Sequence, residues 1–501
     1  LKLPALVASA TLSIFAIDGR RTDLRTDPLL VHYDLLQQGR LWWSADATQL
    51  YFLHDERGFR TLSLRVADAS SGATRQILEE RSRTSLWPPY AEPSRITAGD
   101  AAEVFWLSER SGWNHLYRHD RHSGALLSAM TEGDWRVDDI VHVDPAGRWV
   151  YLTARGREPG RDPYYQHLYR VRFDGSGLQL LTPEDAQHEI AFSPDGRHFI
   201  DRHSRVDSAP VTTLRQADGR EVAVLERADL GALLAAGWQK PERFKVKGRD
   251  GRTDIYGVLY RPSNFDPARR YPVIDAIYGG PQTIYAPTAF TPGMAIAELG
   301  FIVVQMDGMG TPGRSRAFHE ASYGAGFAEA GGLPDHVAGI RELAARHTFI
   351  DADRVGIVGH SAGGYAAVRA LLDHSDVYKV AVSSAGSHDQ RLYQLEWGER
   401  FVGHPFLDPD SYRTQANVLQ AGKLRGKLLL MQGELDDDVH PVNTMQLVDA
   451  LMQANKDFDL LLFPRGNHGL GSNPYFIRRQ WDYFVRHLLG AEPPPDYRIG
   501  K

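Results

Sequence analysis

The residues with the clearest chemical meaning are 359–363, where Gly-His-Ser-Ala-Gly fits the pattern G-x-S-x-G. The short apolar run at 353–359 predicts a buried strand, and residues 364–372 have the composition and apolar spacing of a helix. A serine on a tight turn between a strand and a helix is typical of a nucleophile elbow, where glycines let the backbone pass without a Cβ clash. An ordinary glycine-rich turn shares the pattern but not these flanks. Ser361 is therefore predicted to be the nucleophile of an acyl transfer.

A serine hydroxyl is a weak nucleophile at neutral pH, so it needs a base, and an acid must orient that base. Asp436 follows a predicted strand at 427–431, and His468 lies in a glycine-flanked loop after a strand predicted at 458–463. The order Ser, Asp, His is the one expected when each partner follows a later strand of the same sheet. Asp436 and His468 are predicted to complete a catalytic triad.

Other polar residues near these positions have simpler explanations. The chain has 20 histidines, so most are expected at the surface or satisfied within the fold. His440 is too near Asp436 in sequence to be the base, and His360 is expected to point away from the serine. The acidic run 436–438 suggests a metal site, but no histidine spacing supports one. We expect neither a metal nor a cofactor.

The tetrahedral intermediate of acyl transfer needs two hydrogen-bond donors. The backbone N–H of Ala362, directly after the nucleophile, is predicted to be one of them. The second is expected from the loop 278–281, Tyr-Gly-Gly-Pro, which follows an earlier strand. Either a backbone N–H of this loop or the hydroxyl of Tyr278 suits the role.

Residues 233–501 predict the scaffold that positions these groups. Apolar strands alternate with helical segments there, which implies a mostly parallel sheet covered by helices on both faces. Together with the elbow, this is the arrangement of an α/β-hydrolase domain. Further strands are predicted at 272–278, 302–306 and 380–384, the strand before the elbow includes 355–358, and further helices are predicted at 332–345 and 442–454.

Residues 1–232 carry an internal repeat that is visible in their turns. Asp-Gly, Ser-Gly or similar pairs between β-rich runs recur at a nearly constant spacing, and such pairs favour hairpins. Two hairpin signals in each period predict four-stranded blades of a β-propeller, with an irregular β-sandwich as the alternative. We expect about four to five blades and a first hairpin that begins in mid-blade, as in a fragment or a truncated relative. The turn glycines are Gly19, Gly72, Gly124, Gly177 and Gly219.

Composition excludes several functional classes. The length of 501 residues is too great for one ordinary core, and the net charge of −6 argues against binding of nucleic acid. The absence of cysteine excludes disulfides, thiolate catalysis and thiolate-bound metals. No stretch approaches the roughly 20 apolar residues of a membrane helix, so no membrane span is expected. The mildly apolar residues 3–17 fit the β repeat better than a signal peptide.

Five motifs, in this order, give residues 233–501 a specific resemblance to the prolyl oligopeptidase family of serine peptidases, in its dipeptidyl peptidase IV branch. The first 230 residues resemble the C-terminal part of that branch's propeller. The resemblance implies that Ser361, Asp436 and His468 form the triad and that the Tyr278 hydroxyl binds the oxyanion. The motifs are Tyr-Gly-Gly-Pro at 278–281, Met-Asp-Gly-Met-Gly-Thr at 306–311, Gly-His-Ser-Ala-Gly-Gly at 359–364, Gly-Glu-Leu-Asp-Asp-Asp-Val-His at 433–440 and Asn-His-Gly at 467–469.

The resemblance also implies substrate contacts. Tyr393 and Trp397 fall where this branch places aromatic walls of a proline-accepting S1 pocket, and Gln390 stands where a third wall is usually tryptophan. Asp438 replaces an asparagine that contacts the substrate backbone in this branch. The glutamate pair that grips the substrate amine in the branch comes from an earlier propeller segment. The nearby pair at 79–80 suits a blade edge better than a binding site.

Three functions follow as alternatives. The leading one is a serine peptidase that works through an acyl-enzyme on Ser361 and releases N-terminal dipeptides from peptide substrates, with small or proline residues before the cleaved bond. An acylaminoacyl peptidase or broad esterase uses the same groups. A propeller-bearing binding protein with weak catalysis is the alternative of another class. The resemblance further suggests a homodimer and a periplasmic or secreted bacterial protein.

Overall fold

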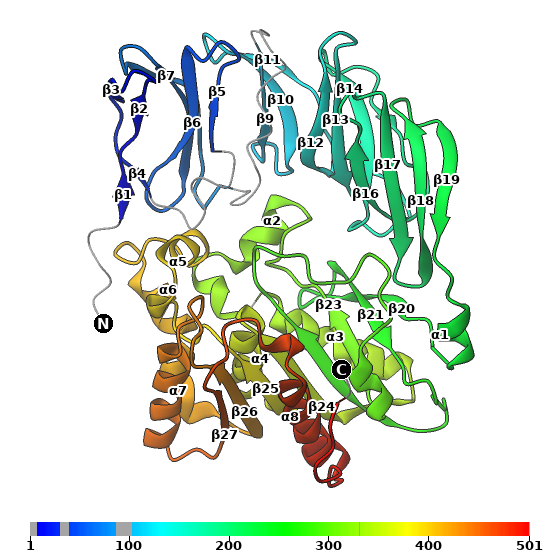
Figure 1. The fold of residues 1–501 in the computed structure, drawn as a ribbon. Helices are drawn as coiled ribbons and strands as arrows, with labels where there is room; N and C mark the ends of the chain where they lie inside the picture. Colours follow the sequence, from blue (N-terminus) through cyan, green and yellow to red (C-terminus); the bar gives the residue numbers. More distant parts are fainter. Residues whose placement is uncertain (1–7, 31–39, 87–102, 330, 500–501) are drawn as a thin grey trace.

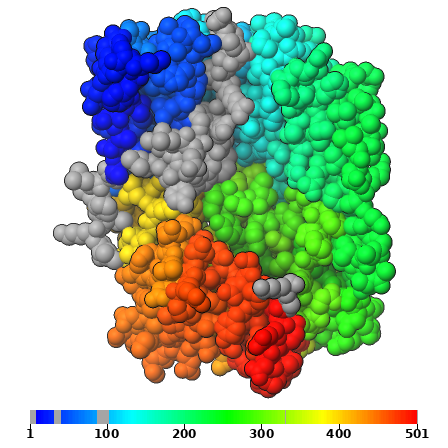
Figure 2. Space-filling model, in the orientation of Figure 1, coloured from blue at the N-terminus to red at the C-terminus, as the bar shows by residue number. Residues whose placement is uncertain are grey.

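The computed structural model describes residues 8–30, 40–86, 103–329 and 331–499. Apart from one short helix, the regular elements described in the first half are β-strands, and the second half is a layered α/β domain below them in Figure 1. We refer to strands β1–β19 as the propeller and to β20 and everything after it as the hydrolase domain. In Figure 2 the C-terminal orange and red segments lie at the end remote from the propeller.

The propeller consists of consecutive antiparallel sheets that stand side by side (Figure 1). Among the described residues three sheets have four strands and one has three, after two short two-stranded sheets. The blades and the first hairpin thus agree with the predicted repeat. The short pairs are β1 (Ser9–Ala10) with β4 (Leu29–Leu30) and β2 (Ser13–Phe15) with β3 (Arg21–Asp23); the blades are β5 (Leu41–Trp43), β6 (Gln49–Asp55), β7 (Thr61–Asp68) and β8 (Thr74–Arg81); β9 (Glu103–Ser108), β10 (His115–Asp120) and β11 (Leu126–Ala129); β12 (Arg136–Asp144), β13 (Trp149–Arg155), β14 (Gln166–Arg172) and β15 (Gln179–Leu180); and β16 (Gln187–Phe192), β17 (His198–Arg205), β18 (Ser208–Gln216) and β19 (Glu221–Arg227).

Gly124, one of the repeated turn glycines, serves both its turn and the packing of the blades. Gly124 has a φ of 73°, in the left-handed region that disfavours other residues. A Cβ at this position would lie 1.8 Å from the carbonyl oxygen of Ile77, in the preceding blade. The turn also depends on Asp120, whose carboxylate accepts hydrogen bonds from the backbone N–H groups of His122 and Ser123. Gly124 is therefore required both by its turn and by its contact with the neighbouring blade.

The hydrolase domain has one eight-stranded sheet in the order β20-β21-β23-β22-β24-β25-β26-β27. Its first two strands are antiparallel, and all strands from β23 onward run parallel. The predicted strands lie within the observed ones or differ from them by a residue at an end. The strands are β20 (Glu242–Lys247), β21 (Asp254–Tyr260), β22 (Tyr271–Ile277), β23 (Ile302–Met306), β24 (Ile350–His360), β25 (Tyr378–Ser384), β26 (Lys427–Gly433) and β27 (Asp459–Phe463).

Helices bury apolar side chains on both faces of this sheet. One core cluster joins Leu343, Leu371 and Leu447 from three helices to one face, and another places Phe484 and Leu488 against the other face. Among the helices of the described residues, none combines the length and the apolar composition that a membrane span requires. The helices are α1 (Gly231–Ala235), α2 (Arg316–His319), α3 (Leu333–Arg346), α4 (Ala362–Asp373), α5 (Leu395–Phe401), α6 (Pro409–Gln415), α7 (Val442–Gln453) and α8 (Pro474–Phe484).

The propeller contacts helix α5 of the hydrolase domain. Arg57 of the propeller forms an ion pair of 2.6 Å with Glu399 of α5, a side chain that is only 1% exposed. The guanidinium of Arg400, also on α5, lies 4.1 Å from the centre of the Phe59 ring and donates to the backbone oxygen of Leu86. The position of α5 is thus set from both domains.

Candidate active site

Ser361 lies at the turn between β24 and α4, as the elbow predicts. Its φ of 59° and ψ of −120° are unusual for a residue other than glycine. A Cβ at Gly359 would lie 2.1 Å from the oxygen of Gly363, and one at Gly363 would lie 2.3 Å from the oxygen of Ile277. The glycines are thus required by close backbone approach, and the strained turn presents the serine at the end of the sheet.

His468 and Asp436 form a hydrogen-bonded pair at the same end of the sheet. Nδ1 of His468 lies 2.9 Å from Oδ2 of Asp436, which is 2% exposed. The other oxygen of Asp436 accepts from the backbone N–H groups of Asp438 and Val439. Burial alone would raise the pKa of Asp436, but the hydrogen bond and charge of His468 and these N–H donors lower it. The carboxylate is therefore suited to hold the imidazole with Nε2 facing the cavity.

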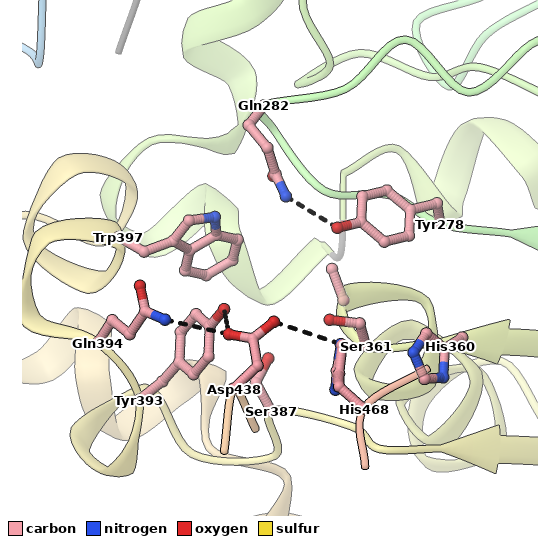
Figure 3. Close-up of a pocket in the computed structure, with 11 residues that line it drawn as sticks. Tyr278, Gln282, His360, Ser361, Ser387, Tyr393, Gln394, Trp397, Asp438 and His468 are labelled. Atoms are coloured by element: carbon pink, nitrogen blue, oxygen red, sulfur yellow. Dashed lines mark hydrogen bonds and ion pairs between the residues drawn. The ribbon is translucent and has the colours of Figure 1, made fainter. Parts of the chain in front are cut away.

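The cavity beside this pair has a volume of about 400 Å³ (Figure 3). The structure brings seven of the nine predicted site residues into its lining or its edge, in addition to the Asp436 carboxylate behind His468. It is lined by Tyr278, Gln282, His360, Ser361, Ala362, Ser387, Tyr393, Gln394, Trp397, Asp438 and His468.

The prediction that His360 points away from the site is wrong. Its ring packs against that of His468, with ring centres 4.5 Å apart, and it lines the cavity. Nδ1 of His360 is 2.9 Å from the hydroxyl oxygen of Ser384. Burial, followed by the charge of His468, lowers the pKa of His360 to about 4. His360 thus has an uncharged ring that packs against the candidate base. In the sequence, only its position directly before the serine could have indicated that it lines the cavity.

The two predicted oxyanion donors lie where two strands end. Ala362 is the first residue of α4, and Tyr278 directly follows β22. The Tyr278 side chain reaches the cavity, where its hydroxyl accepts a 2.9 Å hydrogen bond from Nε2 of Gln282. Burial and the charge of Asp438 raise the pKa of Tyr278, which keeps its hydroxyl protonated and able to donate. Of the two alternatives for the second donor, this position favours the hydroxyl.

Two aromatic rings form one wall of the cavity. Tyr393 and Trp397 meet edge to face, with ring centres 5.4 Å apart and an angle of 83°. Trp397 belongs to α5, and Phe327 packs against its other side at 5.2 Å. Trp397 of this wall is therefore held by the helix that the propeller also contacts.

Gln390 does not line the cavity, contrary to the predicted third wall. It is 2% exposed, and its amide nitrogen donates to the backbone oxygen and the hydroxyl of Ser387, both at 3.0 Å. Ser387 and Gln394 line the cavity instead, and sequence reasoning missed both. Gln394 directly follows Tyr393, but neighbours in sequence face the same cavity only where the backbone turns, which the residue types did not indicate.

Asp438 lies in the cavity, as predicted, with a set of partners that sequence did not foresee. Oδ1 accepts hydrogen bonds from the hydroxyl of Tyr393 at 2.9 Å and from Nε2 of Gln394 at 3.0 Å. Oδ2 lies 3.4 Å from Nε2 of His468. Asp438 therefore contacts the nitrogen of His468 that is predicted to accept the proton of Ser361.

The glutamate pair in the propeller is used within its own blades. Glu79 forms an ion pair of 2.5 Å with Arg81, and Glu80 accepts hydrogen bonds from Trp106 and Ser108. Neither lines the cavity. These contacts agree with the interpretation of the pair as a blade edge.

One group of side chains in the described residues has spacing suited to a metal ion. His188, Asp201 and His203, in the last blade, have ligand atoms within 4.8 Å of one another. Nε of Arg215 lies 3.0 Å from a carboxylate oxygen of Asp201, and its positive charge opposes a cation there. None of these residues lines the cavity.

Comparison with known proteins matches two separate regions of the chain. Residues 289–491 match the prolyl oligopeptidase family, and residues 9–210 match the dipeptidyl peptidase IV (DPP IV) N-terminal region. The chain is 31% identical over 431 residues to dipeptidyl peptidase 8 of Homo sapiens, covering 77% of this chain and 46% of that protein. It is 30% identical over 407 residues to the probable dipeptidyl-aminopeptidase B of Emericella nidulans, covering 77% and 44%. The chain thus spans about half the length of these curated relatives.

Solved structures show the same fold. The crystal structure of Porphyromonas gingivalis dipeptidyl peptidase 4 superposes with a TM-score of 0.84 at 24% identity, covering 95% of this chain and 67% of the other. A putative dipeptidyl aminopeptidase IV from Bacteroides ovatus gives a TM-score of 0.85 at 24% identity, covering 95% and 70%. The motifs, the two matched regions and the relatives together show that the chain belongs to the prolyl oligopeptidase family. A dipeptidyl peptidase IV type N-terminal region precedes its hydrolase domain.

Proposed function

We propose that this chain is a serine peptidase that cleaves peptide bonds through an acyl-enzyme on Ser361. The observation that carries the proposal is the presence of Ser361 and the hydrogen-bonded pair of His468 and Asp436 at one cavity. Oγ of Ser361 attacks the carbonyl carbon of the substrate while Nε2 of His468 takes its proton. The Tyr278 hydroxyl and the N–H of Ala362 bind the oxyanion.

The second half of the reaction uses the same groups. The C–N bond breaks as His468 returns the proton to the leaving amine, which departs. A water molecule then gives a proton to His468 and attacks the ester carbonyl, and the acid product leaves Ser361 with its hydroxyl restored. Asp436 keeps Nδ1 of His468 protonated throughout, so that Nε2 remains the atom that exchanges the proton.

The proposed substrates are peptides with a free N-terminus, from which dipeptides are released. The edge-to-face pair of Tyr393 and Trp397 supports a small or proline residue before the cleaved bond, because both fit a short apolar pocket. Relatives named dipeptidyl peptidase and dipeptidyl-aminopeptidase support release in units of two residues. An acylaminoacyl peptidase is the second candidate, since the Glu79 and Glu80 carboxylates are engaged within the blades.

A panel of p-nitroanilides tests the proposal. Hydrolysis of Gly-Pro and Ala-Pro anilides, but not of their N-acetylated forms, supports the dipeptidyl activity. Faster hydrolysis of acetyl-amino-acid anilides supports the second candidate instead. A fluorophosphonate probe should label the wild type and not Ser361→Ala; absence of labelling in the wild type contradicts both and leaves a binding protein.

The resemblance also motivates two proposals about the whole protein. We propose a homodimer, which sedimentation of the purified chain tests. We further propose a periplasmic or secreted location, which fractionation of the source cells with a compartment marker tests. A monomer in sedimentation, or recovery with the cytoplasmic marker, contradicts the respective proposal.

A further inference from the structure

The cavity holds a single carboxylate that the proposed reaction does not use. Of the eleven described residues that line it, Asp438 is the one acidic side chain. Two neutral donors, the Tyr393 hydroxyl and the Gln394 amide, bind its Oδ1. Both come from the segment that forms the aromatic wall, so the carboxylate is fixed relative to the pocket for the first side chain.

The other oxygen of Asp438 faces the reacting groups. Oδ2 lies 3.4 Å from Nε2 of His468, the atom that must reach both the Ser361 hydroxyl and the leaving nitrogen. In Figure 3 this contact crosses from the wall of the cavity to the candidate base. A substrate cation bound at Oδ2 therefore has to lie very near the carbonyl carbon under attack.

The covalent geometry of a peptide decides which cation fits. The α-ammonium group of a single residue is two bonds from its own carbonyl carbon, whereas the ammonium group of a dipeptide unit is five bonds from the carbon that is attacked. The shorter distance matches a carboxylate in contact with His468 Nε2. In a dipeptide unit the same position holds an amide nitrogen, which carries no charge, and in proline it carries no hydrogen either.

We propose that Asp438 binds the α-ammonium group of a single N-terminal residue, so that the site also releases single amino acids from peptides as an aminopeptidase. This inference rests on the proposed serine peptidase function of the same cavity. The ion pair also explains how the base is freed: the ammonium group takes the place of His468 Nε2 at Oδ2, and Nε2 can then accept the proton of Ser361. The substrate thereby helps to activate the base.

A matched set of anilides tests this activity. We expect the wild type to hydrolyse alanine and proline p-nitroanilides with a free amine, and acetyl-alanine p-nitroanilide much more slowly. Asp438→Asn keeps the shape and one hydrogen-bonding oxygen but removes the charge. It should lower the ratio of kcat/KM for free alanine anilide over its acetylated form by about tenfold or more, since a charge-assisted hydrogen bond is lost.

Two controls separate this effect from general damage. Asp437→Asn removes a neighbouring exposed charge and should leave the ratio within about threefold of the wild type. Fluorophosphonate labelling of Asp438→Asn reports whether the triad is intact, and the ratio is independent of any loss common to both substrates. An unchanged ratio in Asp438→Asn contradicts the assigned role.

The failure of this inference differs from the failure of the proposed function. Probe labelling and hydrolysis of Gly-Pro anilide, without hydrolysis of the single-residue anilides, would overturn the aminopeptidase activity and leave the serine peptidase in place. Absence of both labelling and hydrolysis would overturn both. A competition assay gives an independent readout: alanine boronic acid should inhibit Gly-Pro anilide hydrolysis more strongly than its N-acetyl form, and Asp438→Asn should remove the difference.

Discussion

Three carboxylates act on the imidazole of His468. Burial alone would lower its pKa, but the hydrogen bond and charge of Asp436, followed by the charges of Asp438 and Asp437, raise it above the ordinary value of 6.5. The raised pKa makes His468 a better proton acceptor from Ser361, at the cost of being protonated at a higher pH. Asp438 thus affects both the proton affinity of the base and the charge of the pocket.

This balance predicts the pH dependence of the reaction. Because His468 must be neutral to accept the serine proton, kcat/KM should fall as the pH falls through a value above 6.5. Asp438→Asn removes one of the charges that raise the pKa, so its acidic limb should move to lower pH. The acidic limbs of the wild type and of Asp438→Asn are measured from the rates of acetyl-alanine anilide hydrolysis between pH 5 and 9. This substrate has no ammonium group that could itself interact with Asp438. A limb that does not move in Asp438→Asn would show that its charge does not reach the base.

At the residue scale, the sequence predicted a site residue well wherever the role can be filled by only one residue type. Ser361 is marked by the glycines that its strained turn requires, and Asp436 and His468 by their places after strands. The prediction that Gln390 forms a third wall was wrong. Its position matches that of an aromatic residue in the family, but this match does not show in which direction the shorter amide side chain points. His360 was misjudged for a related reason, since the backbone reversal at Ser361 brings its predecessor back to the cavity.

At the scale of elements, a buried polar link joins two strands and a helix beneath the site. Asp275 on β22 binds Nδ1 of His336 on α3 at 2.9 Å and accepts a 2.7 Å hydrogen bond from Tyr378 on β25. The three side chains are at most 1% exposed. Burial would lower the pKa of His336, but the charge and hydrogen bond of Asp275 raise it. β22 and β25 flank β24, whose end carries Ser361, so this link holds the strands beside the nucleophile.

Removing the carboxylate should therefore cost stability. Asp275→Ala leaves a histidine and a hydroxyl buried without their partner, and we expect a loss of about 3–5 kcal/mol in the free energy of unfolding in urea. Since the folded pKa of His336 is raised, this contribution is complete below about pH 6.5 and declines as the pH rises through the folded value. Asp353→Ala, at an exposed position of β24, is the control. An equal loss at pH 5 and pH 9 would contradict the charge-based account.

At the same scale, the periodicity of the sequence predicted the strands of both domains. It could not predict the buried polar contacts that link one strand to another element. The parallel strands are apolar runs bounded by turns, so their positions followed from composition. The three-residue link between Asp275, His336 and Tyr378 spans about a hundred residues of sequence. Such a partnership depends on strand order, which local patterns do not encode.

At the scale of the whole molecule, the propeller contacts the helix that carries part of the proposed substrate pocket. Arg57 pairs with Glu399, and Trp397 of the aromatic wall lies half a turn away on the same helix, α5. Arg57→Ala leaves the buried carboxylate of Glu399 without this partner. We expect a rise in KM for Gly-Pro anilide that exceeds the change in kcat, and a loss of about 2–4 kcal/mol in stability.

Matched variants test this account. Arg197→Ala removes an exposed propeller arginine and should leave both quantities near the wild type. Adding Glu399→Gln to Arg57→Ala removes the buried charge and should restore much of the stability. A fall in kcat with unchanged KM would show that α5 does not transmit the propeller contact to the wall.

A second charge at the interface gives a pH prediction. Glu109 of the propeller is 5% exposed and lines a small cavity with Arg316 and Glu320; burial raises its pKa to about 7, against the opposing charges of Arg136 and Arg316. An acid with a raised folded pKa favours the protonated folded state, so stability should fall as the pH rises from about 4.5 to 7. Glu109→Gln should be more stable than the wild type at pH 8, by roughly 1–3 kcal/mol in urea unfolding. Equal free energies of unfolding for Glu109→Gln and the wild type at pH 8 would contradict this account of the buried Glu109 carboxylate.

The contacts that both domains make with α5 have a consequence for how the protein loses activity on warming. The triad depends on strand ends within one domain, whereas the wall formed by Trp397 depends on a contact between two. On gradual warming, we expect the contact between domains to open before the central sheet. Discrimination among substrates would then decline while the hydroxyl of Ser361 still reacts, and the molecule would pass through a less selective state before it becomes inactive.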